Sequence, residues 1–575
     1  MKSVNRFLCL AIFIVAGCAQ QTVINKPNRE IQPENGAFLG YAKDLPLEVI
    51  QQYLLTCVDT VKQLDQISPS HEKNLLHEVK DLYRYNDYSL IWTTLTAPNS
   101  DAKDLLNEIA ECREHGLNPD HYLSDSLFAQ FDNTYLYNQE IDILRLIQLD
   151  IKLSSAYMAY AHDLHYGQID PILLGENWQL SKRYIELAPY MKGKTFKEAI
   201  KMVTPKSDEY KALQKKLQSY LALRNEGGWN TLPDTLYVNP GEAHEAIYLL
   251  RDRLFYSGDY NSKGLRTTSR SLMYDDDLQK SLSNFQRRHG LKDDGILNKE
   301  TIDELNVPIE HRIDQIRINL ERLKWIAEPE SEKSIVVNIP DFKLTLYKKS
   351  KGIKSFKTIV GKRTSKTPIL SDQIEYITFS PSWFVPDISF NRQVLPKAKK
   401  DPNYLEQLGF KLYARKDVKG ESPIDANSVQ WNNVDMINTK FKALHVPSSS
   451  DVTSGKIKFA MPNKEGLYIC DAANPALFDF AFRPFNFSSI SVENPELLAR
   501  YLLDDKHWDI NTIREHMKAS KPESVSLTKK VGVNVVYLTA WVDTNGELQF
   551  RDDIYGYDQA HSALLKLEDE RWNQR

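Results

Sequence analysis

Apolar residues three or four positions apart recur along the first third of the chain. The spacing is clear at Leu55, Val58, Val61 and Leu64, and the run from Ile141 to Leu164 repeats it. Such spacing places an apolar stripe on one side of a helix. We therefore predict a mostly helical region from about residue 45 to residue 228.

A second helical unit follows and ends in a charged helix. We predict helices at 242–256, 276–289 and 299–305, with Gly290 and Gly295 in turns between the last two. Glycine suits such turns because it adopts positive φ without steric cost. A charged helix at 309–325 then leads to the next unit.

The pattern changes to short alternating or continuous apolar runs from Ser334 onward. Such runs predict strands. The predicted strands lie at 335–339, 344–347, 355–360, 374–379, 456–461 and 467–469. Residues 533–542 and 547–551 flank Asn545-Gly546, a pair typical of a hairpin turn. Helices are expected at 497–503 and 510–517, and the Pro-rich stretch 386–445 is expected to be an irregular, lid-like insert.

The length of the chain predicts how many domains it has, and its composition excludes several classes of protein. The chain has 575 residues, 42% hydrophobic and 26% charged, which is ordinary for globular domains and predicts about three or four of them. Disordered, collagen-like and disulfide-rich small proteins are excluded. Lys+Arg 73 against Asp+Glu 77 gives a net charge of −4, so no overall basic field favours nucleic acid.

The first residues have the features of a targeting segment. Lys2 and Arg6 precede an apolar stretch from Phe7 to Val15, which is typical of a secretory signal peptide. The following Ala16-Gly17-Cys18 resembles a bacterial lipobox, which implies cleavage before Cys18 and lipid attachment to it. Ala19 rather than Asp follows, and by the same resemblance this favours a periplasmic protein anchored to the outer membrane. The alternative is a plain signal peptide with a chance cysteine.

The remaining cysteines give no metal or redox motif. Cys57 and Cys112 lie in predicted helices and are able to pair, although the sequence leaves this open. No CxxC occurs, and His162 and His165 lack a third ligand, so we expect no metal site. No cofactor is implied.

Residues 284–301 resemble the peptidoglycan-binding domain family 1. The similarity lies in Asn284 to Leu291 (NFQRRHGL), in Asp294-Gly295 and in Thr301. It implies a small three-helix module in which Phe285 is a core residue and Gln286 caps or packs. The family usually has glycine where this chain has Asn298. The alternative is a helical spacer without a ligand.

The segment from about 334 to 550 resembles the YkuD-type L,D-transpeptidase family, in its long periplasmic subtype. The similar motifs are VVNIP (336–340), IVGKRTSKTP (359–368), SPSWFVP (380–386), VLPK (394–397), GKIKFAMP (455–462) and YLTAWVD (537–543). The helical region shares LYRYNDYSLIW (82–92) and AYMAYAHDLHYGQIDP (156–171) with the scaffold of that subtype.

The predicted fold class is multidomain α+β. It combines a helical scaffold, a three-helix peptidoglycan-binding module and a mixed, β-rich L,D-transpeptidase-like domain with an inserted lid. The expected boundaries are 1–17 for the signal peptide, 18–42 for the anchor and tether, 43–229 for the scaffold, 230–307 for the peptidoglycan-binding module, 308–333 for a linker helix, 334–550 for the transpeptidase-like domain and 551–575 for a C-terminal tail.

The resemblance implies a cysteine nucleophile activated by a histidine on a neighbouring strand. Here Cys470 stands at the position of the family's histidine and Ser489 at that of its cysteine. Ser488 replaces the family's glycine and Ser491 its arginine or asparagine, and Tyr468, Asp471 and Arg483 flank the two positions. The nucleophile, the base and a flanking donor are therefore all changed.

These replacements favour an inactive member of the family that binds peptidoglycan stem peptides, glycan or a cell-wall enzyme. His445, 25 residues upstream of Cys470, is interpreted as a loop or core-edge histidine rather than a base. One alternative is an active crosslinking transpeptidase that uses Ser489 or Cys470. Another is an interaction scaffold whose helical region binds a cell-wall protein.

Overall fold

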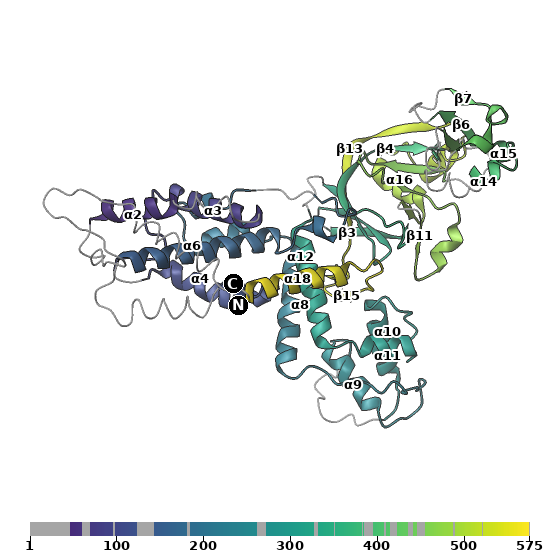
Figure 1. Cartoon of the computed structure of the whole chain (residues 1–575). Coiled ribbons are helices and arrows are strands. Elements are labelled where there is room, and N and C mark those ends of the chain that lie inside the picture. The colour runs from purple at the N-terminus through teal and green to yellow at the C-terminus, as the bar shows by residue number, and fades with distance from the viewer. Residues whose placement is uncertain are drawn as a thin grey trace. The chain divides into compact units, whose positions relative to one another are not determined.

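The computed structural model divides into two compact units (Figure 1). It describes residues 46–59, 70–95, 98–122, 143–180, 185–260, 272–326, 332–349, 351–381, 383–384, 395–407, 410–414, 422–434, 441–445, 455–486, 489–519 and 521–573. The expected signal peptide, Cys18, the tether and Ser488 lie outside these residues. The mixed helical and β-rich fold class predicted above is confirmed.

Unit 1 joins residues 1–175 and 181–325 to 539–575. Its α-helices are α2 (Leu47–Asp59), α3 (Ser70–Tyr85), α4 (Ser100–Glu111), α6 (Ile143–Tyr166), α7 (Phe196–Val203), α8 (Asp208–Asn225), α9 (Ile247–Tyr256), α10 (Asp276–Arg288), α11 (Lys299–Leu305), α12 (Ile309–Lys324) and α18 (Tyr557–Asn573). Short 3-10 turns are η3 (Cys112–His115), η4 (Pro119–His121), η5 (Pro171–Leu174) and η6 (Ala188–Met191), and the strands are β14 (Ala540–Val542) and β15 (Leu548–Phe550).

Helix α6 contributes many residues to the core of the N-terminal helices, and it carries one buried carboxylate, Asp150. Asp150 is fully buried and accepts hydrogen bonds from the Tyr83 hydroxyl at 2.6 Å and from the Trp92 backbone N–H at 2.9 Å. The Thr93 hydroxyl donates to it at 2.9 Å. A buried carboxylate needs such donors to offset its lost hydration. Asp150 therefore fixes the loop after α3 against α6.

The helix that we named a linker packs in a core of unit 1. The apolar stripe of α12 contacts that of α8 and the β14–β15 hairpin. The packed residues are Tyr210, Leu213, Leu217, Ile309, Ile313, Ile316, Leu320, Ala540, Leu548 and Phe550. The hairpin predicted at Asn545-Gly546 is confirmed, because β14 and β15 pair antiparallel there.

Residues 551–575, which we named a tail, include helix α18. Its Asp558 accepts a hydrogen bond from Arg322 of α12 at 2.6 Å. Its buried His561 stacks on Trp325 with ring centroids 5.3 Å apart. The end of the chain therefore packs on α12 through one ion pair and one stacked ring pair.

The module of α9 to α11 has the three helices that the sequence predicted. Phe285 is fully buried in its core. Gln286 donates to the Ile296 carbonyl at 2.9 Å and accepts from the Gly295 N–H at 2.8 Å, which fixes the turn before α11. Asn298 caps α11 by accepting from the Thr301 N–H at 2.8 Å.

Unit 2 joins residues 176–180 to 326–538 and is built on a nine-stranded sheet. The sheet strands are β1 (Lys333–Asn338), β2 (Lys343–Lys348), β3 (Lys351–Gly361), β4 (Leu370–Phe379), β9 (Ile457–Ala460), β10 (Ile469–Cys470), β11 (Pro484–Asn486), β12 (Ile490–Val492) and β13 (Glu523–Val536). Their order is β11-β3-β12-β10-β9-β4-β13-β1-β2, and β2 also pairs with β3, so the sheet closes on itself. Helices α16 (Pro495–Leu503) and α17 (Ile510–His516) and the turn η10 (Pro475–Asp479) complete it.

The insert contains more regular structure than we expected. Its described parts form a four-stranded sheet of β5 (Trp383–Phe384), β8 (Phe441–His445), β6 (Phe410–Ala414) and β7 (Pro423–Ile424). They also include α14 (Leu395–Ala398), α15 (Tyr404–Gln407), η8 (Ala426–Ser428) and η9 (Trp431–Asn433). The prediction of an irregular insert was wrong in this respect, because a small core around Leu395, Leu412 and Trp431 stabilises these elements.

Within the ranges given above, the helices are too short or too polar to cross a membrane.

Candidate functional site

The parallel pairing of β10 with β12 brings the candidate residues together. Ile469 pairs with Ile490 and Cys470 with Ser491. On the other side of β10, Cys470 pairs with Lys458 of β9. Alternate residues of a strand share one face, so Tyr468 and Ser489 lie on the same face as this row. The structure thus collects the two family positions and their polar neighbours in one place.

Cys470 is a buried, neutral thiol. It is 8% exposed, and its Sγ lies 3.7 Å from both the Ile490 carbonyl oxygen and the Ser491 hydroxyl. Burial, together with the neighbouring Asp471 carboxylate, raises the pKa of the thiol to about 12. A thiol with this pKa is protonated at neutral pH and is a poor nucleophile and a poor base.

Ser489 is half-buried, and its hydroxyl hydrogen-bonds with the Tyr468 phenol. Burial raises the pKa of Tyr468 to about 12, although the bond to Ser489 opposes this. The Lys458 ammonium lies 4.4 Å from the centre of the Tyr468 ring, and burial lowers the pKa of Lys458. Among the described residues, the side chains that contact or electrostatically influence Cys470 and Ser489 include no histidine imidazole.

Asp471 and Arg483 hold the backbone of the site. Asp471 accepts from the backbone N–H groups of Lys456 at 2.8 Å and Ile457 at 3.1 Å, which joins the end of β10 to β9. Arg483 is buried and donates to the carbonyl oxygens of Thr358 at 3.1 Å and Phe342 at 3.0 Å. Their contacts are with the backbone, so both residues position the strands.

The sequence did not single out Asn486, which bonds to β3, to β12 and to the Ser489 backbone. Its amide donates to the carbonyl oxygens of Ile359 at 3.2 Å and Ser489 at 3.1 Å, and to the Ser491 hydroxyl at 3.0 Å. These contacts join strands that are distant in sequence. No local motif marks such a role, so sequence reasoning had no signal for it.

His445 lies on strand β8 of the insert's small sheet, where its backbone pairs with Trp383 and Phe410. The loop half of the expectation was therefore wrong, while the core-edge half stays a prediction. Its side chain lies outside the described parts of the structure.

Cys112 is a buried free thiol in unit 1. The side chain of Cys57, with which the sequence left a bond open, lies outside the described parts of the structure.

Three family models match the chain. Residues 332–489 match the YkuD model, described as "L,D-transpeptidase catalytic domain". Residues 77–217 match "Scaffold domain" and residues 244–305 match "Putative peptidoglycan binding domain". The chain therefore carries a catalytic domain of the YkuD-type L,D-transpeptidase family together with a scaffold domain and a peptidoglycan-binding domain.

A curated relative comes from Haemophilus influenzae and is named "Putative L,D-transpeptidase". The two chains are 28% identical over 328 residues. The alignment covers 54% of this chain and 65% of the relative, so it spans less than two thirds of that protein.

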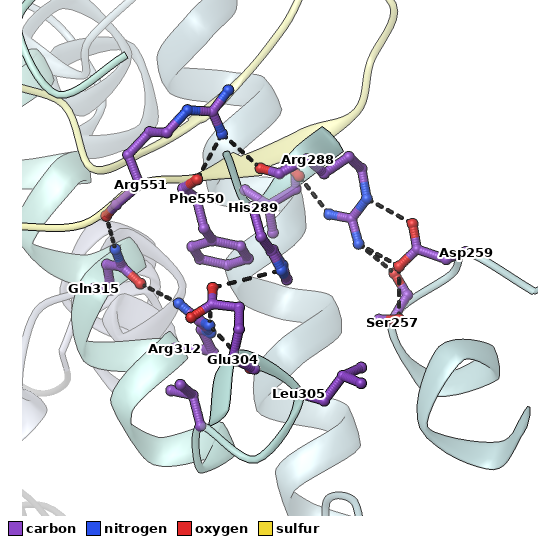
Figure 2. Close-up of polar contacts among 12 residues, drawn as sticks. Ser257, Asp259, Arg288, His289, Glu304, Leu305, Arg312, Gln315, Phe550 and Arg551 are labelled. Carbon is purple, nitrogen blue, oxygen red and sulfur yellow. Dashed lines mark hydrogen bonds and ion pairs between the residues drawn. The ribbon is translucent and has the colours of Figure 1, made fainter. Parts of the chain in front are cut away.

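A second polar cluster joins the peptidoglycan-binding domain to α12 and the C-terminal hairpin within unit 1. Figure 2 shows Arg312 of α12 bonded to Glu304, and Arg551 donating to the Arg288 carbonyl oxygen at 2.8 Å. Arg288 bonds to Asp259, with its Nε 2.7 Å from a carboxylate oxygen. His289 is buried among these groups, with its ring 5.2 Å from that of Phe550.

The buried guanidinium groups bond to backbone oxygens as well as to carboxylates. Arg253 donates to the Leu305 carbonyl at 2.7 Å, and Arg288 donates to the Leu548 carbonyl. Buried charges are tolerated when they are paired and hydrogen-bonded in this way. The cluster therefore fixes the peptidoglycan-binding domain to the β14–β15 hairpin, and its buried guanidinium groups have oxygen acceptors beside them.

We predict that Cys470 resists alkylation in the folded protein. Because its pKa is raised to about 12, little thiolate is present at pH 8. Iodoacetamide at pH 8 should modify Cys470 at least about 100-fold more slowly than in the denatured chain. Peptide mass mapping over time measures this rate. Alkylation at the denatured rate would contradict the buried placement of the thiol.

We predict that His289 makes the protein less stable as pH falls. Burial, followed by the charges of Arg312, Arg288, Arg253 and Arg551, lowers the pKa of His289 well below 6.5, while the Glu304 carboxylate faces it at 3.5 Å. The unfolded chain then binds a proton near pH 6.5 that the folded chain does not. Stability is full above that pH and declines below it, by about 1.4 kcal/mol between pH 7.5 and 5.5.

Denaturant unfolding of the parent and of His289→Gln at both pH values tests this. The variant should lose about 1.4 kcal/mol less than the parent over this interval. The matched control is His311→Gln, which changes an exposed histidine on α12 and should keep the parent's pH dependence. Equal losses for the parent and His289→Gln would show that His289 is protonated in the folded protein.

Proposed function

We propose that this chain binds peptidoglycan in the cell envelope and that its L,D-transpeptidase domain is catalytically silent. The observation that carries the proposal is Cys470, a buried thiol at the position of the family's histidine. An acyl transfer by a thiol or hydroxyl needs a base within hydrogen-bond reach of the nucleophile. Cys470 with its raised pKa does not serve as one.

The surroundings of Ser489 support the same proposal. A serine hydroxyl attacks a carbonyl only when a base takes its proton. The partner of Ser489 is the Tyr468 phenol, whose pKa is itself raised to about 12. Loss of a catalytic base lowers the reaction rate by several orders of magnitude. The contacts that bind a ligand in its ground state do not require the base.

Two features support peptidoglycan as the partner. Residues 244–305 match a peptidoglycan-binding domain model, and residues 332–489 match a domain whose family acts on peptidoglycan stem peptides. Both domains keep ordered cores around Phe285 and around the closed sheet. We therefore infer that the changed side chains of Cys470 and Ser489 leave the fold of both domains in place.

The decisive experiment exposes the purified chain to a carbapenem, which acylates the nucleophile of active family members. We expect no covalent mass gain on the intact protein, because the described contacts of Cys470 and Ser489 give neither of them a histidine base. The same preparation should co-sediment with purified sacculi. An active cysteine-containing L,D-transpeptidase, treated in parallel, is the control for acylation.

A mass gain on Ser489 or Cys470 would overturn catalytic silence and favour a second candidate function, a crosslinking transpeptidase. The observation that favours it is Lys458, an amine with a lowered pKa beside the ring of Tyr468, which bonds to Ser489. Lysine serves as the base of some serine enzymes. In that case Lys458→Gln should abolish the acylation of Ser489.

We also propose that Cys18 carries a lipid that anchors the chain to the outer membrane from the periplasm. The support is the sequence of residues 1–18, with its basic start, apolar stretch and small residues before the cysteine. Metabolic labelling with palmitate should mark the parent and leave Cys18→Ser unlabelled, with Cys9→Ser as the labelled control. Label on the Cys18→Ser chain would contradict the anchor.

A further inference from the structure

The segment between β10 and β11 exposes two aromatic side chains on unit 2. Phe480 and Phe482 are each 56% exposed, although phenylalanine is among the residue types most often buried. Pro475 and Ala476, earlier in the same segment, are exposed as well. We call residues 475–482 the aromatic loop. Exposed apolar residues gathered in this way mark a surface that contacts a partner or a membrane.

A buried guanidinium fixes the backbone of the aromatic loop. Arg483 donates to the Phe480 carbonyl at 2.6 Å and, on its other side, to the Phe342 carbonyl at 3.0 Å. The rings of Phe482 and Phe342 contact each other, with their centroids 5.7 Å apart. The two exposed rings are therefore held at the surface by a fixed backbone, which reduces the entropy lost when they bind.

The aromatic loop lies beside the hairpin of β2 and β3. The Lys357 ammonium of β3 donates to the Phe478 carbonyl at 3.2 Å. Phe342, which contacts Phe482, directly precedes β2. The loop and this hairpin therefore form one continuous surface of unit 2.

This hairpin belongs to the most basic stretch of unit 2. Residues 342–371 contain nine lysines and arginines and no aspartate or glutamate, whereas the whole chain has a net charge of −4. Six of the nine are exposed lysines of the β2–β3 hairpin, namely Lys343, Lys348, Lys349, Lys351, Lys354 and Lys357. Positive charge is thus gathered on the element that contacts the aromatic loop.

Strand pairing sets these lysines against one another. Lys343 lies directly opposite Lys357, and Lys348 lies directly opposite Lys351. Like charges at opposed positions of an antiparallel pair are destabilising. The fold accepts this repulsion twice in one hairpin, and an anionic surface laid against the hairpin would relieve it.

Carboxylates offset only part of this charge. Three ion pairs have separations of 3.5 to 4.0 Å, and these are Lys343–Asp341, Lys357–Glu493 and Lys349–Glu332. Their lysine side chains stay at least 46% exposed, and such pairs contribute little. A fourth carboxylate, Asp504, pairs with Lys333 of β1 at 2.7 Å. The hairpin therefore keeps an excess of positive charge.

We propose that the aromatic loop and the lysines of the β2–β3 hairpin bind the surface of an anionic phospholipid bilayer. Phe480 and Phe482 insert among the lipid headgroups, and the lysines contact the lipid phosphates. Aromatic rings beside long basic side chains are typical of protein surfaces that lie in a membrane interface. The inference goes beyond the proposed function, because peptidoglycan binding does not involve this surface, and it adds a second membrane contact to the proposed lipid on Cys18.

Co-sedimentation with vesicles tests the proposal on the chain from residue 19 onward, which keeps every described residue and lacks Cys18. Because this protein carries no lipid, the result does not depend on the proposed anchor. Vesicles of phosphatidylethanolamine with about a quarter phosphatidylglycerol should bind it at least about tenfold more tightly than vesicles of phosphatidylcholine. Equal binding to both kinds of vesicle, or no binding to the anionic vesicles, would overturn the proposal.

Aromatic variants test the loop. Phe480→Ser combined with Phe482→Ser should weaken binding to the anionic vesicles about tenfold, because it removes the exposed apolar area. Phe480→Trp should bind at least as tightly as the parent, since a tryptophan ring also favours the interface. The matched control is Tyr376→Ser, because Tyr376 is 40% exposed on β4, which pairs with neither β2 nor β3. Binding of the double variant at the parent's level would exclude the loop from the contact.

Lysine variants test the charge and remain informative if the aromatic variant does not fold. Lys343→Gln combined with Lys351→Gln removes one member of each opposed pair. The Tm should equal or exceed that of the parent because the repulsion is relieved, while binding to the anionic vesicles weakens about tenfold. Lys529→Gln, which changes an exposed lysine of β13, should bind like the parent. Unchanged binding by the folded lysine variant would overturn the proposal.

Discussion

The candidate site depends on the parallel pairing of β10 with β12, two very short strands. This pairing sets Cys470 opposite Ser491 and carries Tyr468 alongside Ser489. It is held at its ends by side chains that bond to backbone groups, Asp471 to β9 and Asn486 to β3. Because these contacts do not involve the side chains at the positions of the family's histidine and cysteine, both side chains can change while the register is kept. The shape of the site and its reactivity are therefore separate properties of this fold.

The sequence predicted the elements whose signals are local. Asn545-Gly546 marked the hairpin, and the apolar spacing marked α8, α10 and α12 because a helix repeats its face every three or four residues. The family motifs also singled out Cys470 and Ser489, whose assignment to the family's catalytic positions stays a prediction. The sequence did not indicate the partners of these elements: the stripe of α12 packs on a hairpin more than 200 residues further along the chain. Sequence reasoning did not identify the contacts of Asn486 and Lys458 for the same reason. These contacts arise only when distant segments pair as neighbouring strands.

The peptidoglycan-binding domain shows how such long-range packing is stabilised. Arg253, Arg288 and Arg312 lie inside unit 1, where unpaired cations would be costly. Each donates to a backbone carbonyl or to a carboxylate, and Arg312 also lies over the Phe550 ring, with its guanidinium carbon 4.6 Å from the ring centre. Truncation of one member would leave a charge buried without its partner, which is more harmful than the absence of the whole network. The cluster therefore holds the domain and the hairpin in one arrangement. Substitution of one member is expected to be more destabilising than replacement of both partners of a pair.

Binding and reaction make different demands on a protein. Acyl transfer requires groups that act in the transition state, above all a base and a nucleophile within bonding distance. Retention of a ligand requires only ground-state contacts on a rigid surface. The domain that matches a peptidoglycan-binding model keeps its own buried core around Phe285, which does not include Cys470. Under the proposed function, replacement of the imidazole and the thiol removes the reaction and leaves the binding surface, so that a catalytic domain of this kind continues as a binding domain.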